Sequence, residues 1–254
     1  MTPALASPSP ASTAAAAPAV IEVHQLYKRF GLKTVLRGLD FSVAQGEFVA
    51  LLGPNGAGKT TFLRILASLS RPALGQVRVA GYQLPQHASA VRRRLGVVSH
   101  LPLLYGDLTA EENLSFYGRM YGVESLERRV LQVLELVGLS SRRRDLVRTF
   151  SRGMQQRLAI GRAVLHDPDV VLFDEPHTGL DQQACQMLDN VLREVAARGR
   201  TVVMTSHDLA RAAGLATRFD ILSQGKIIAS AQAADLAQDA LLGFYRQALE
   251  GSAA

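Results

Sequence analysis

A glycine-rich segment between an apolar run and a helical stretch has the residue types that bind phosphate. Residues 53–60 are GPNGAGKT and match the spacing GxxxxGK[ST]. The three glycines let backbone N–H groups approach phosphate oxygens, and the N-terminus of the following helix adds a favourable dipole. Lys59 would bring a positive charge to the β- and γ-phosphates, and the Thr60 hydroxyl would bind Mg²⁺. The segment predicts a nucleotide-phosphate site made by Gly53, Pro54, Asn55, Gly56, Ala57, Gly58, Lys59, Thr60 and Thr61.

Two adjacent acids follow a second apolar run, 170–173, at Asp174 and Glu175. In α/β sheets the carboxyl ends of the strands carry the ligands, so both acids are expected at the phosphate site. Asp174 would hold Mg²⁺, and Glu175 would polarise the attacking water as general base. A solvated Asp-Glu turn is the alternative for such a pair taken alone. The phosphate motif upstream favours the catalytic interpretation.

These motifs need a parallel sheet that presents several strand ends at one edge. The run 48–52 is apolar on both faces, as expected of a buried parallel strand, and a helix follows the glycines. Further strand signals lie before and after a mainly helical stretch, so we predict an α/β fold whose sheet region is split by a helical insertion. The expected strands are 20–30, 35–43, 77–84, 170–173, 201–204, 220–222 and 227–228, the helical insertion is about 86–158, and a terminal helix covers 233–249.

The composition of the chain is that of a globular protein. The 254 residues contain 48% hydrophobic side chains, enough for a core of one or two domains, and the single cysteine, Cys185, cannot form an internal disulfide. Residues 1–19, rich in Ala, Pro and Ser and without charge, predict a disordered tail and lack the features of a secretory signal. No run approaches the roughly 20 apolar residues that span a bilayer. If the protein serves a membrane, another chain is expected to cross it.

The net charge of +6 includes two arginine triplets, 92–94 and 142–144. Solvated helix faces are the favoured interpretation of such runs, ahead of a nucleic-acid or membrane surface. Aromatic residues are only 6% of the chain and do not interleave with the arginines, so no nucleic-acid partner is expected.

The chain resembles the ATP-binding cassette (ABC) ATPases over about residues 20–230. The most specific element is FSRGMQQR at 150–157, which is similar to the family's LSGGQ signature and precedes the acidic strand. The resemblance implies a P-loop NTPase fold with a mixed parallel core sheet, an N-terminal antiparallel β subdomain and an inserted helical subdomain, followed by a C-terminal helix and tail at 231–254. It also implies ATP and Mg²⁺ as cofactors and a head-to-tail dimer. Ser151 and Gly153 would then contact the γ-phosphate of the partner subunit's ATP.

Other family elements occur in the expected order. His207 matches the switch histidine that contacts the γ-phosphate, and Asp181 matches the aspartate of the D-loop at the dimer seam. Phe30 stands where the family's aromatic residue stacks on adenine, with Tyr27 as the nearby alternative. Core packing is the other explanation for either ring.

Two positions depart from the family pattern. His100 stands where the family usually has the glutamine that contacts Mg²⁺ and water, and Arg152 replaces the first glycine of the signature. Neutral imidazole accepts a hydrogen bond through one nitrogen, as the glutamine oxygen does, whereas protonated imidazole cannot. We expect His100 to keep a role at the metal and Arg152 to leave Ser151 and Gly153 accessible.

One phosphate motif and one signature, only 92 residues apart, predict a single nucleotide-binding subunit of a transporter, acting as a homodimer with integral membrane subunits. It would lie peripherally on the cytoplasmic face of the inner membrane. The segments SHLPLLYGDLTAEENLSFY and SRGMQQR resemble haem exporter or cytochrome c maturation subunits and, more loosely, ABC-2 type exporters of a drug, lipid or polysaccharide. A soluble ABC ATPase acting on ribosomes or DNA is a further alternative. A P-loop kinase would not explain the signature and the Asp-Glu pair together.

The His100 substitution generates a testable expectation. If this imidazole must be neutral to accept, ATP hydrolysis by the wild type should fall more steeply below about pH 6.5 than hydrolysis by a His100→Gln variant. Steady-state rates measured across the acid range compare the two proteins. Superimposable pH–rate profiles would contradict the role given to His100.

Overall fold

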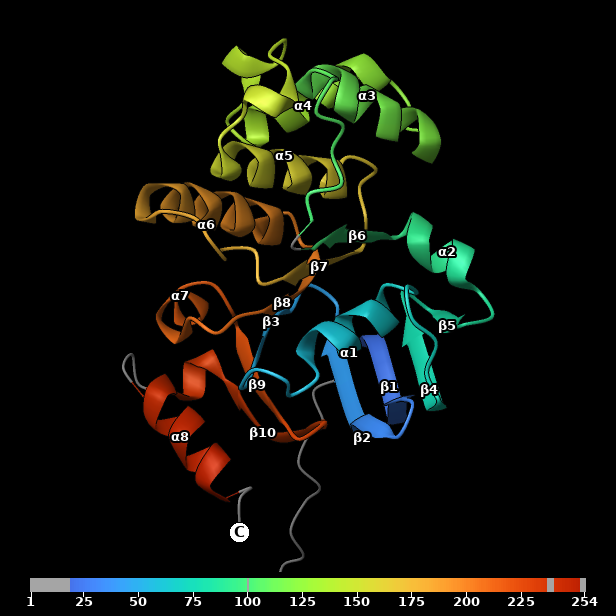
Figure 1. Cartoon of the computed structure of the whole chain (residues 1–254), viewed down its shortest axis with the longest axis vertical. Coiled ribbons are helices and arrows are strands. Elements are labelled where there is room, and N and C mark those ends of the chain that lie inside the picture. Colours follow the sequence, from blue (N-terminus) through green and yellow to red (C-terminus); the bar gives the residue numbers. More distant parts are fainter. Residues whose placement is uncertain (1–18, 100, 237–239, 252–254) are drawn as a thin grey trace, which may run out of the picture.

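The computed structural model describes residues 19–99, 101–236 and 240–251, and within them the strands form two sheets (Figure 1). A four-stranded antiparallel sheet has the order β2-β1-β4-β5, and a six-stranded sheet has the order β10-β9-β3-β8-β7-β6. The strands are β1 (Ala19–Phe30), β2 (Lys33–Ala44), β3 (Phe48–Leu52), β4 (Leu74–Val79), β5 (Tyr82–Leu84), β6 (Leu95–Val98), β7 (Val170–Asp174), β8 (Thr201–Thr205), β9 (Arg218–Ser223) and β10 (Lys226–Gln232).

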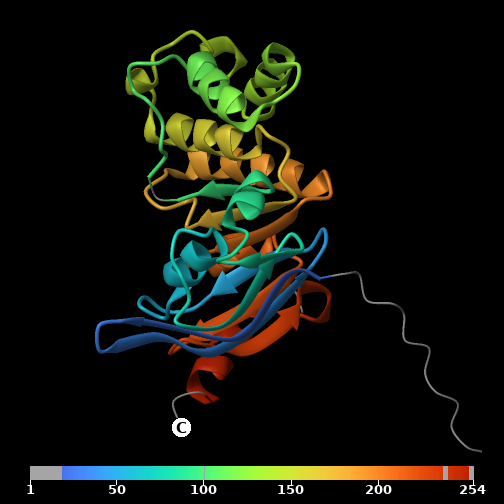
Figure 2. The same cartoon turned by 90° about the vertical axis from the view of Figure 1, so that its right-hand side faces the viewer.

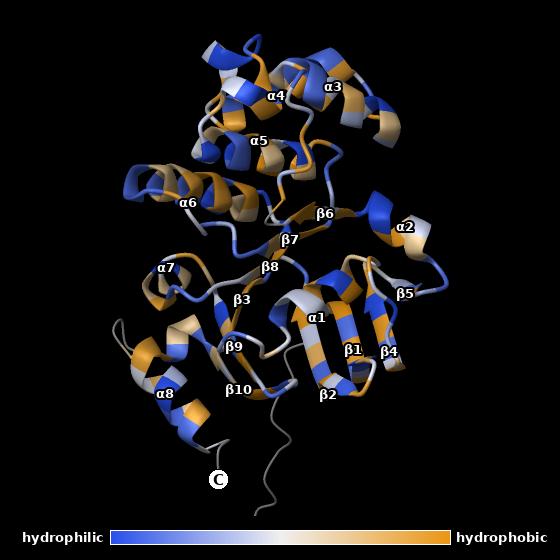
Figure 3. Cartoon of the chain, viewed as in Figure 1, coloured by the Kyte–Doolittle hydropathy of each residue, from blue (hydrophilic) through white to orange (hydrophobic). Residues whose placement is uncertain are grey.

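The six-stranded sheet is parallel except at its edge, where β10 runs antiparallel to β9. Every residue of β3, β7 and β8 is buried, which explains why these strands are continuous apolar runs. Successive side chains of a strand point to opposite faces, so Phe48 and Ala50 enter one core while Val49 and Leu51 enter the other. Figure 3 shows hydrophobic colour along most of β6 and β7 and alternating colour on β1 and β2.

The helices cover the six-stranded sheet on both sides. Helix α1 packs in the core between the two sheets, whereas α5 and α6 belong to the core on the opposite face, and α3 and α4 form a lobe beyond them (Figures 1 and 2). Figure 2 also shows the β1–β2 hairpin (blue) projecting to one side. The helices are α1 (Lys59–Leu66), α2 (Ala88–Arg93), α3 (Ala110–Tyr121), α4 (Leu126–Leu136), α5 (Arg152–Val164), α6 (Gln182–Ala197), α7 (Leu209–Ala213) and α8 (Leu241–Gly251), with single 3₁₀ turns at Ser140–Arg142, Val147–Thr149 and Ala233–Asp235.

The expected boundaries need three corrections. The insertion predicted from about residue 86 is not helical throughout, because β6 pairs with β7 in the six-stranded sheet and the helical lobe begins at α3. The stretch LGVV is too short for its periodicity to separate a strand from a helix. Of the tail predicted over 1–19, residues 1–18 lie outside the described residues, and Ala19 opens β1. The terminal helix is divided into a 3₁₀ turn and α8.

A half-buried histidine joins the lobe to the core. The ring of His166, just after α5, stacks on Tyr121 at the end of α3 with centroids 3.8 Å apart and an interplanar angle of 5°. Burial lowers the pKa of His166 to about 4 from its usual 6.5. The folded protein therefore keeps this imidazole neutral at pH values where an unfolded chain would protonate it.

This contact should make the protein acid-sensitive. Unfolded chains take up a proton near pH 6.5 that the folded protein accepts only near pH 4, so stability should be lost as the pH falls through this window. Between about pH 7.5 and pH 4.5 the contribution amounts to about 2–3 kcal/mol. Urea unfolding at both pH values should show a smaller acid loss for His166→Phe than for wild type. The variant of the exposed His24, His24→Phe, is the control, and equal losses in all three proteins would contradict the assignment.

Candidate functional site

The phosphate motif forms the loop between β3 and α1, and its glycines are required by its shape. Gly53 has φ +148°, and a Cβ atom there would lie 2.1 Å from the carbonyl oxygen of Leu222. Gly58, at φ 112°, precedes the first residue of α1. Side chains are strained in this backbone region, so the loop depends on glycine at both positions. The prediction of a strand, a glycine loop and a helix is confirmed.

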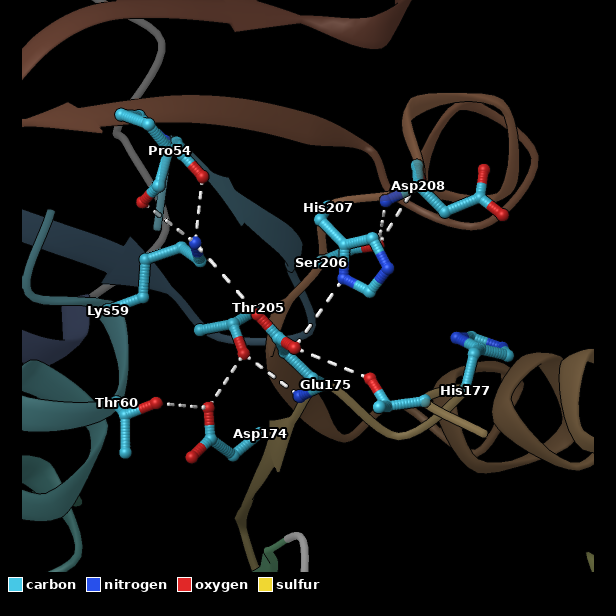
Figure 4. A network of polar contacts seen from close by, with 12 residues as sticks. Pro54, Lys59, Thr60, Asp174, Glu175, His177, Thr205, Ser206, His207 and Asp208 are labelled. Atoms are coloured by element: carbon cyan, nitrogen blue, oxygen red, sulfur yellow. Dashed lines mark hydrogen bonds and ion pairs between the residues drawn. The ribbon is translucent and has the colours of Figure 1, made fainter. Parts of the chain in front are cut away.

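Lys59 is buried at the start of α1, with 6% of its side chain exposed. Its ammonium group donates hydrogen bonds to the carbonyl oxygens of Gly53 (2.7 Å) and Pro54 (3.2 Å) and lies 3.9 Å from Oε1 of Glu175 (Figure 4). Burial lowers the pKa of Lys59, whereas the charges of Glu175 and Asp174 act in the opposite direction. The structure thus places a partly desolvated cation beside the predicted general base.

Asp174 ends β7, and it accepts two hydrogen bonds through one oxygen. The hydroxyls of Thr60 and Thr205 lie 3.0 Å and 2.9 Å from its Oδ1 atom. Thr205, at the end of β8, also accepts a hydrogen bond from the backbone N–H of Glu175 at 2.9 Å. One buried hydroxyl therefore fixes both acids of the Asp-Glu pair. Sequence reasoning missed Thr205, although a threonine at the end of an apolar strand that follows the acidic strand was a signal for it.

Glu175 lies where three segments meet. Its Oε2 atom is 3.5 Å from Nδ1 of His207 and accepts a hydrogen bond from the Thr178 hydroxyl at 3.3 Å (Figure 4). The backbone of Glu175 has φ 49°, which is uncommon for a residue with a side chain. The structure therefore brings together Lys59, Glu175 and His207, the three side chains proposed for catalysis.

Phe30 lies at the end of the β1–β2 hairpin with 54% of its surface exposed. The ammonium of Lys28 is 4.8 Å from the centre of its ring. A cavity of about 420 Å³ is lined by Phe30, by residues 55–61 of the phosphate loop and by Glu175. Tyr27 is half-buried and does not line this cavity. Phe30 is thus the aromatic ring available beside the phosphate loop, and core packing does not account for it.

The signature residues lie outside that cavity in the single chain. Ser151 is the N-cap of α5, and its hydroxyl accepts a hydrogen bond from the N–H of Met154 at 3.3 Å. A Cβ atom on Gly153 would lie 2.8 Å from the Cβ of Ala184 on α6. Asp181 caps α6 by accepting from the N–H of Ala184 at 2.7 Å. His100, predicted near the metal, lies outside the described residues.

Comparison with known proteins identifies the family. Residues 36–178 match the family model described as ABC transporter. The chain is 42% identical over 213 residues to the Nod factor export ATP-binding protein I of Paraburkholderia xenovorans (strain LB400), covering 83% of this chain and 70% of that protein. The chain belongs to the ABC transporter family. The Linearmycin resistance ATP-binding protein LnrL of Bacillus subtilis (strain 168) is 37% identical over 219 residues, covering 85% of this chain and 70% of LnrL.

Two solved structures share the fold. A structure described as the ATP-binding subunit of an ABC transporter superposes with a TM-score of 0.79 at 32% identity, covering 89% of this chain and 99% of the other. The ATP-binding cassette MJ0796, described as a dimer in a post-hydrolysis state bound to ADP and Pi, has a TM-score of 0.75 at 26% identity, covering 84% and 98%. The chain is the ATP-binding, ATP-hydrolysing subunit of an ABC transporter, as its motifs predicted.

The hydroxyl of Thr205 can be tested by an isosteric change. Thr205→Val leaves the N–H of Glu175 without its acceptor and removes one donor from Asp174, which should cost about 1–3 kcal/mol of stability. Because both acids would shift, kcat for ATP hydrolysis should fall about tenfold or more.

Thr201→Val, at the other end of β8, is the matched control. Thr201 also accepts a backbone hydrogen bond, from Gly46 at 2.9 Å, so its loss should lower stability comparably while kcat per folded molecule stays near the wild-type value. Thermal unfolding and steady-state ATPase assays measure both effects. A wild-type kcat for Thr205→Val would contradict the role of this hydroxyl.

Proposed function

We propose that this chain hydrolyses ATP as a homodimer that powers an exporter formed with separate membrane subunits. The observation that supports the proposal most directly is the convergence of Lys59, Glu175 and His207 beside the phosphate loop. Each of the three follows a different strand of the six-stranded sheet: Lys59 comes after β3, Glu175 after β7 and His207 after β8. A purely nucleotide-binding module would need the lysine but not the acid and the imidazole.

ATP would lie with its phosphates in the loop and its adenine against Phe30. Backbone amides of residues 56–60, the Thr61 side chain and the Lys59 ammonium would bind the phosphates. The cavity along Phe30 and the loop has space for such a ligand. On ATP binding, the ammonium would exchange its contacts with the carbonyls of Gly53 and Pro54 for phosphate oxygens. The loop glycines and the start of α1 would supply the remaining charge compensation.

Mg²⁺ fits the residues beside the loop. Thr60 and Asp174 present oxygen atoms 3.0 Å apart, and oxygen is the ligand atom that Mg²⁺ prefers. When bound there, the ion would neutralise developing negative charge on the phosphates. We propose Thr60 and Asp174 as its protein ligands, and His100 as the residue beside it that our sequence interpretation adds.

Glu175 would act on the attacking water. Thr178 and His207 contact its Oε2 atom, while Lys59 lies nearer Oε1, so the carboxylate is held in one orientation. In this orientation it would accept the water's proton as the bond to the γ-phosphorus forms and the bond to the leaving oxygen breaks. His207, exposed on its own loop, would position the γ-phosphate. The transferred phosphoryl group would leave as inorganic phosphate.

We propose that the signature residues take part in a dimer contact. Ser151 and Asp181 are the exposed N-caps of α5 and α6, and Gly153 lies in the first turn of α5. The related cassette MJ0796 is described as dimeric. In a head-to-tail pair these residues would close over the nucleotide of the other subunit, and hydrolysis would open the pair again.

The membrane subunits are proposed to contact an apolar surface at the lobe. Tyr105 and Phe116 are exposed, with ring centroids 5.1 Å apart, and Tyr117 links them to Leu103 by a hydrogen bond to its carbonyl oxygen. Exposed apolar patches mark interaction surfaces. Within the described residues no helix combines the length and apolarity required to cross a bilayer. We propose a peripheral position on the cytoplasmic face of the inner membrane.

The arginine triplets contribute less free charge than the sequence suggests. Arg94 pairs with Asp169 at 2.8 Å, Arg142 with Asp145 at 2.9 Å, and Arg143 with Glu111 at 3.6 Å. Exposed pairs of this kind are weak but reduce the local positive potential. This pairing supports the interpretation of solvated helix faces and gives no support to a nucleic-acid partner.

For the direction of transport we propose export, and haem or the drug, lipid or polysaccharide of an ABC-2 type exporter are the cargo classes that the sequence suggests. One named relative is described as a Nod factor export ATP-binding protein and the other as a linearmycin resistance ATP-binding protein, and neither name mentions haem or cytochrome c maturation. The resemblance of two segments to haem exporters therefore has no support from these relatives. Copurification with a hydrophobic membrane partner, as opposed to ribosomes or DNA, would distinguish the transporter from the soluble alternative.

The role of Glu175 gives the decisive test of this proposal. Glu175→Gln keeps the shape but not the basic carboxylate, so the protein should bind ATP normally while kcat falls at least about 100-fold. The variant should accumulate as a dimer with ATP and Mg²⁺, measured by light scattering. Glu124→Gln, a change at an exposed acid on the lobe, is the control. Near-normal hydrolysis by Glu175→Gln would overturn the proposed mechanism.

A further inference from the structure

A network of polar side chains, formed by His177, Asp189, Arg211 and Asp208, lies beside the loops that carry Glu175 and His207. Nε2 of His177 is 2.7 Å from Oδ1 of Asp189, and Nη1 of Arg211 is 2.9 Å from the other oxygen, Oδ2. Arg211 continues to Asp208, whose Oδ2 atom lies 3.2 Å from Nε and whose Oδ1 accepts from the Arg211 backbone N–H at 3.1 Å. Both oxygens of Asp189 are thus used, and one guanidinium group connects two carboxylates.

The centre of this network of side chains is shielded from water. The side chains of His177 and Asp189 are 9% and 11% exposed, and that of Arg211 is 24% exposed. A buried carboxylate is costly unless donors satisfy it, so Asp189 requires both of its partners. Because an ionised carboxylate only accepts, Nε2 of His177 must carry the proton of their hydrogen bond. Arg211 neutralises the charge of Asp189, and burial lowers the pKa of His177. A neutral imidazole with its proton on Nε2 therefore supplies the donor that Asp189 needs.

The network of side chains joins the two loops that carry Glu175 and His207. His177 is two residues after Glu175, and Asp208 directly follows His207. Asp189 and Arg211 connect these loops through α6 and α7. The backbone N–H of Asp208 also donates to the Ser206 hydroxyl at 3.0 Å, which fixes the other side of His207 (Figure 4).

His207 itself has little packing to position it. Its side chain is 62% exposed, and its Nδ1 atom lies 3.5 Å from Oε2 of Glu175. The orientation of such a side chain depends on the backbone that carries it. The same holds for Glu175, whose backbone has φ 49° at the end of β7. A rigid link between the two backbones therefore has a direct effect on the distance between the two side chains.

We propose that His177, Asp189 and Arg211 form a positioning device that sets the contact between Glu175 and His207. They act through the backbones of the two loops and do not touch the nucleotide. This inference rests on the catalytic roles proposed above for Glu175 and His207. It identifies residues 177, 189 and 211 as determinants of kcat, whereas the KM for ATP depends on the phosphate loop.

Asp189→Asn tests the device because it removes the charge and keeps the shape. Activity is normalised to the number of nucleotide sites titrated with a fluorescent ATP analogue. We expect kcat to fall about tenfold or more while the KM for ATP changes less than about threefold. Glu194→Gln is the matched control on the same helix. Within the described residues the Glu194 side chain accepts hydrogen bonds from the exposed Arg198 alone, so the kcat of this variant should stay at the wild-type value. An unchanged kcat in Asp189→Asn would overturn the proposal.

A double-mutant cycle separates positioning from general stabilisation. In a His207→Ala background there is no imidazole contact left to set, so adding Asp189→Asn should lower kcat by less than about threefold. A residue that only stabilised the fold would lower kcat by the same factor in both backgrounds. Equal factors would therefore overturn the inference.

Variants at His177 cover the case in which Asp189→Asn does not fold. His177→Gln keeps an N–H donor toward Asp189 and should retain at least about half of the wild-type kcat, whereas His177→Leu should lose about tenfold. Equal activity of these two variants would contradict the device. Glu175→Gln separates the two proposals: if it abolishes hydrolysis and the Asp189 and His177 variants have no effect, only this inference fails. If Glu175→Gln retains hydrolysis, the proposed function fails first.

Discussion

The buried carboxylate of Asp174 is the group on which the geometry of this site depends. It is only 9% exposed, so it requires hydrogen-bond donors, and it obtains them from Thr60 at the start of α1 and Thr205 at the end of β8. These two bonds fix a helix and a neighbouring strand against β7. The phosphate loop and the acidic pair are consequently held at the same edge of the sheet, with the Lys59 ammonium between them.

Buried strands support this edge of the sheet from below, and the loops that follow the strands lie above it at the protein surface. Below it, β3, β7 and β8 are buried on both faces between two cores, which leaves the strand ends little freedom to move. Above it, polar bonds help to hold the loops that carry Glu175 and His207 in place. The core therefore holds the strand ends, and the polar bonds set the positions of the loops that follow them.

Sequence patterns predicted the secondary structure correctly where the signal was local and strong. The loop at 53–60 and the buried strand before it are as predicted. They failed at β6, because four apolar residues fit either a strand or a helix, and only pairing with β7 decides between them. They also missed Thr205, whose role exists only because β8 lies beside β7.

The sequence by itself determined the chemistry: a lysine after three glycines, two acids at a strand end and a histidine after another strand are local arrangements with direct chemical meaning. The tertiary structure decided how these groups meet. Glu175 and His207 are 32 residues apart in sequence and 3.5 Å apart in space, and His177, Asp189 and Arg211 come together only through the packing of α6 and α7. The physical reason is that burial makes unpaired charge costly, so the fold must supply a partner for each buried charge, and the spacing of residues along the chain does not specify which partner that is.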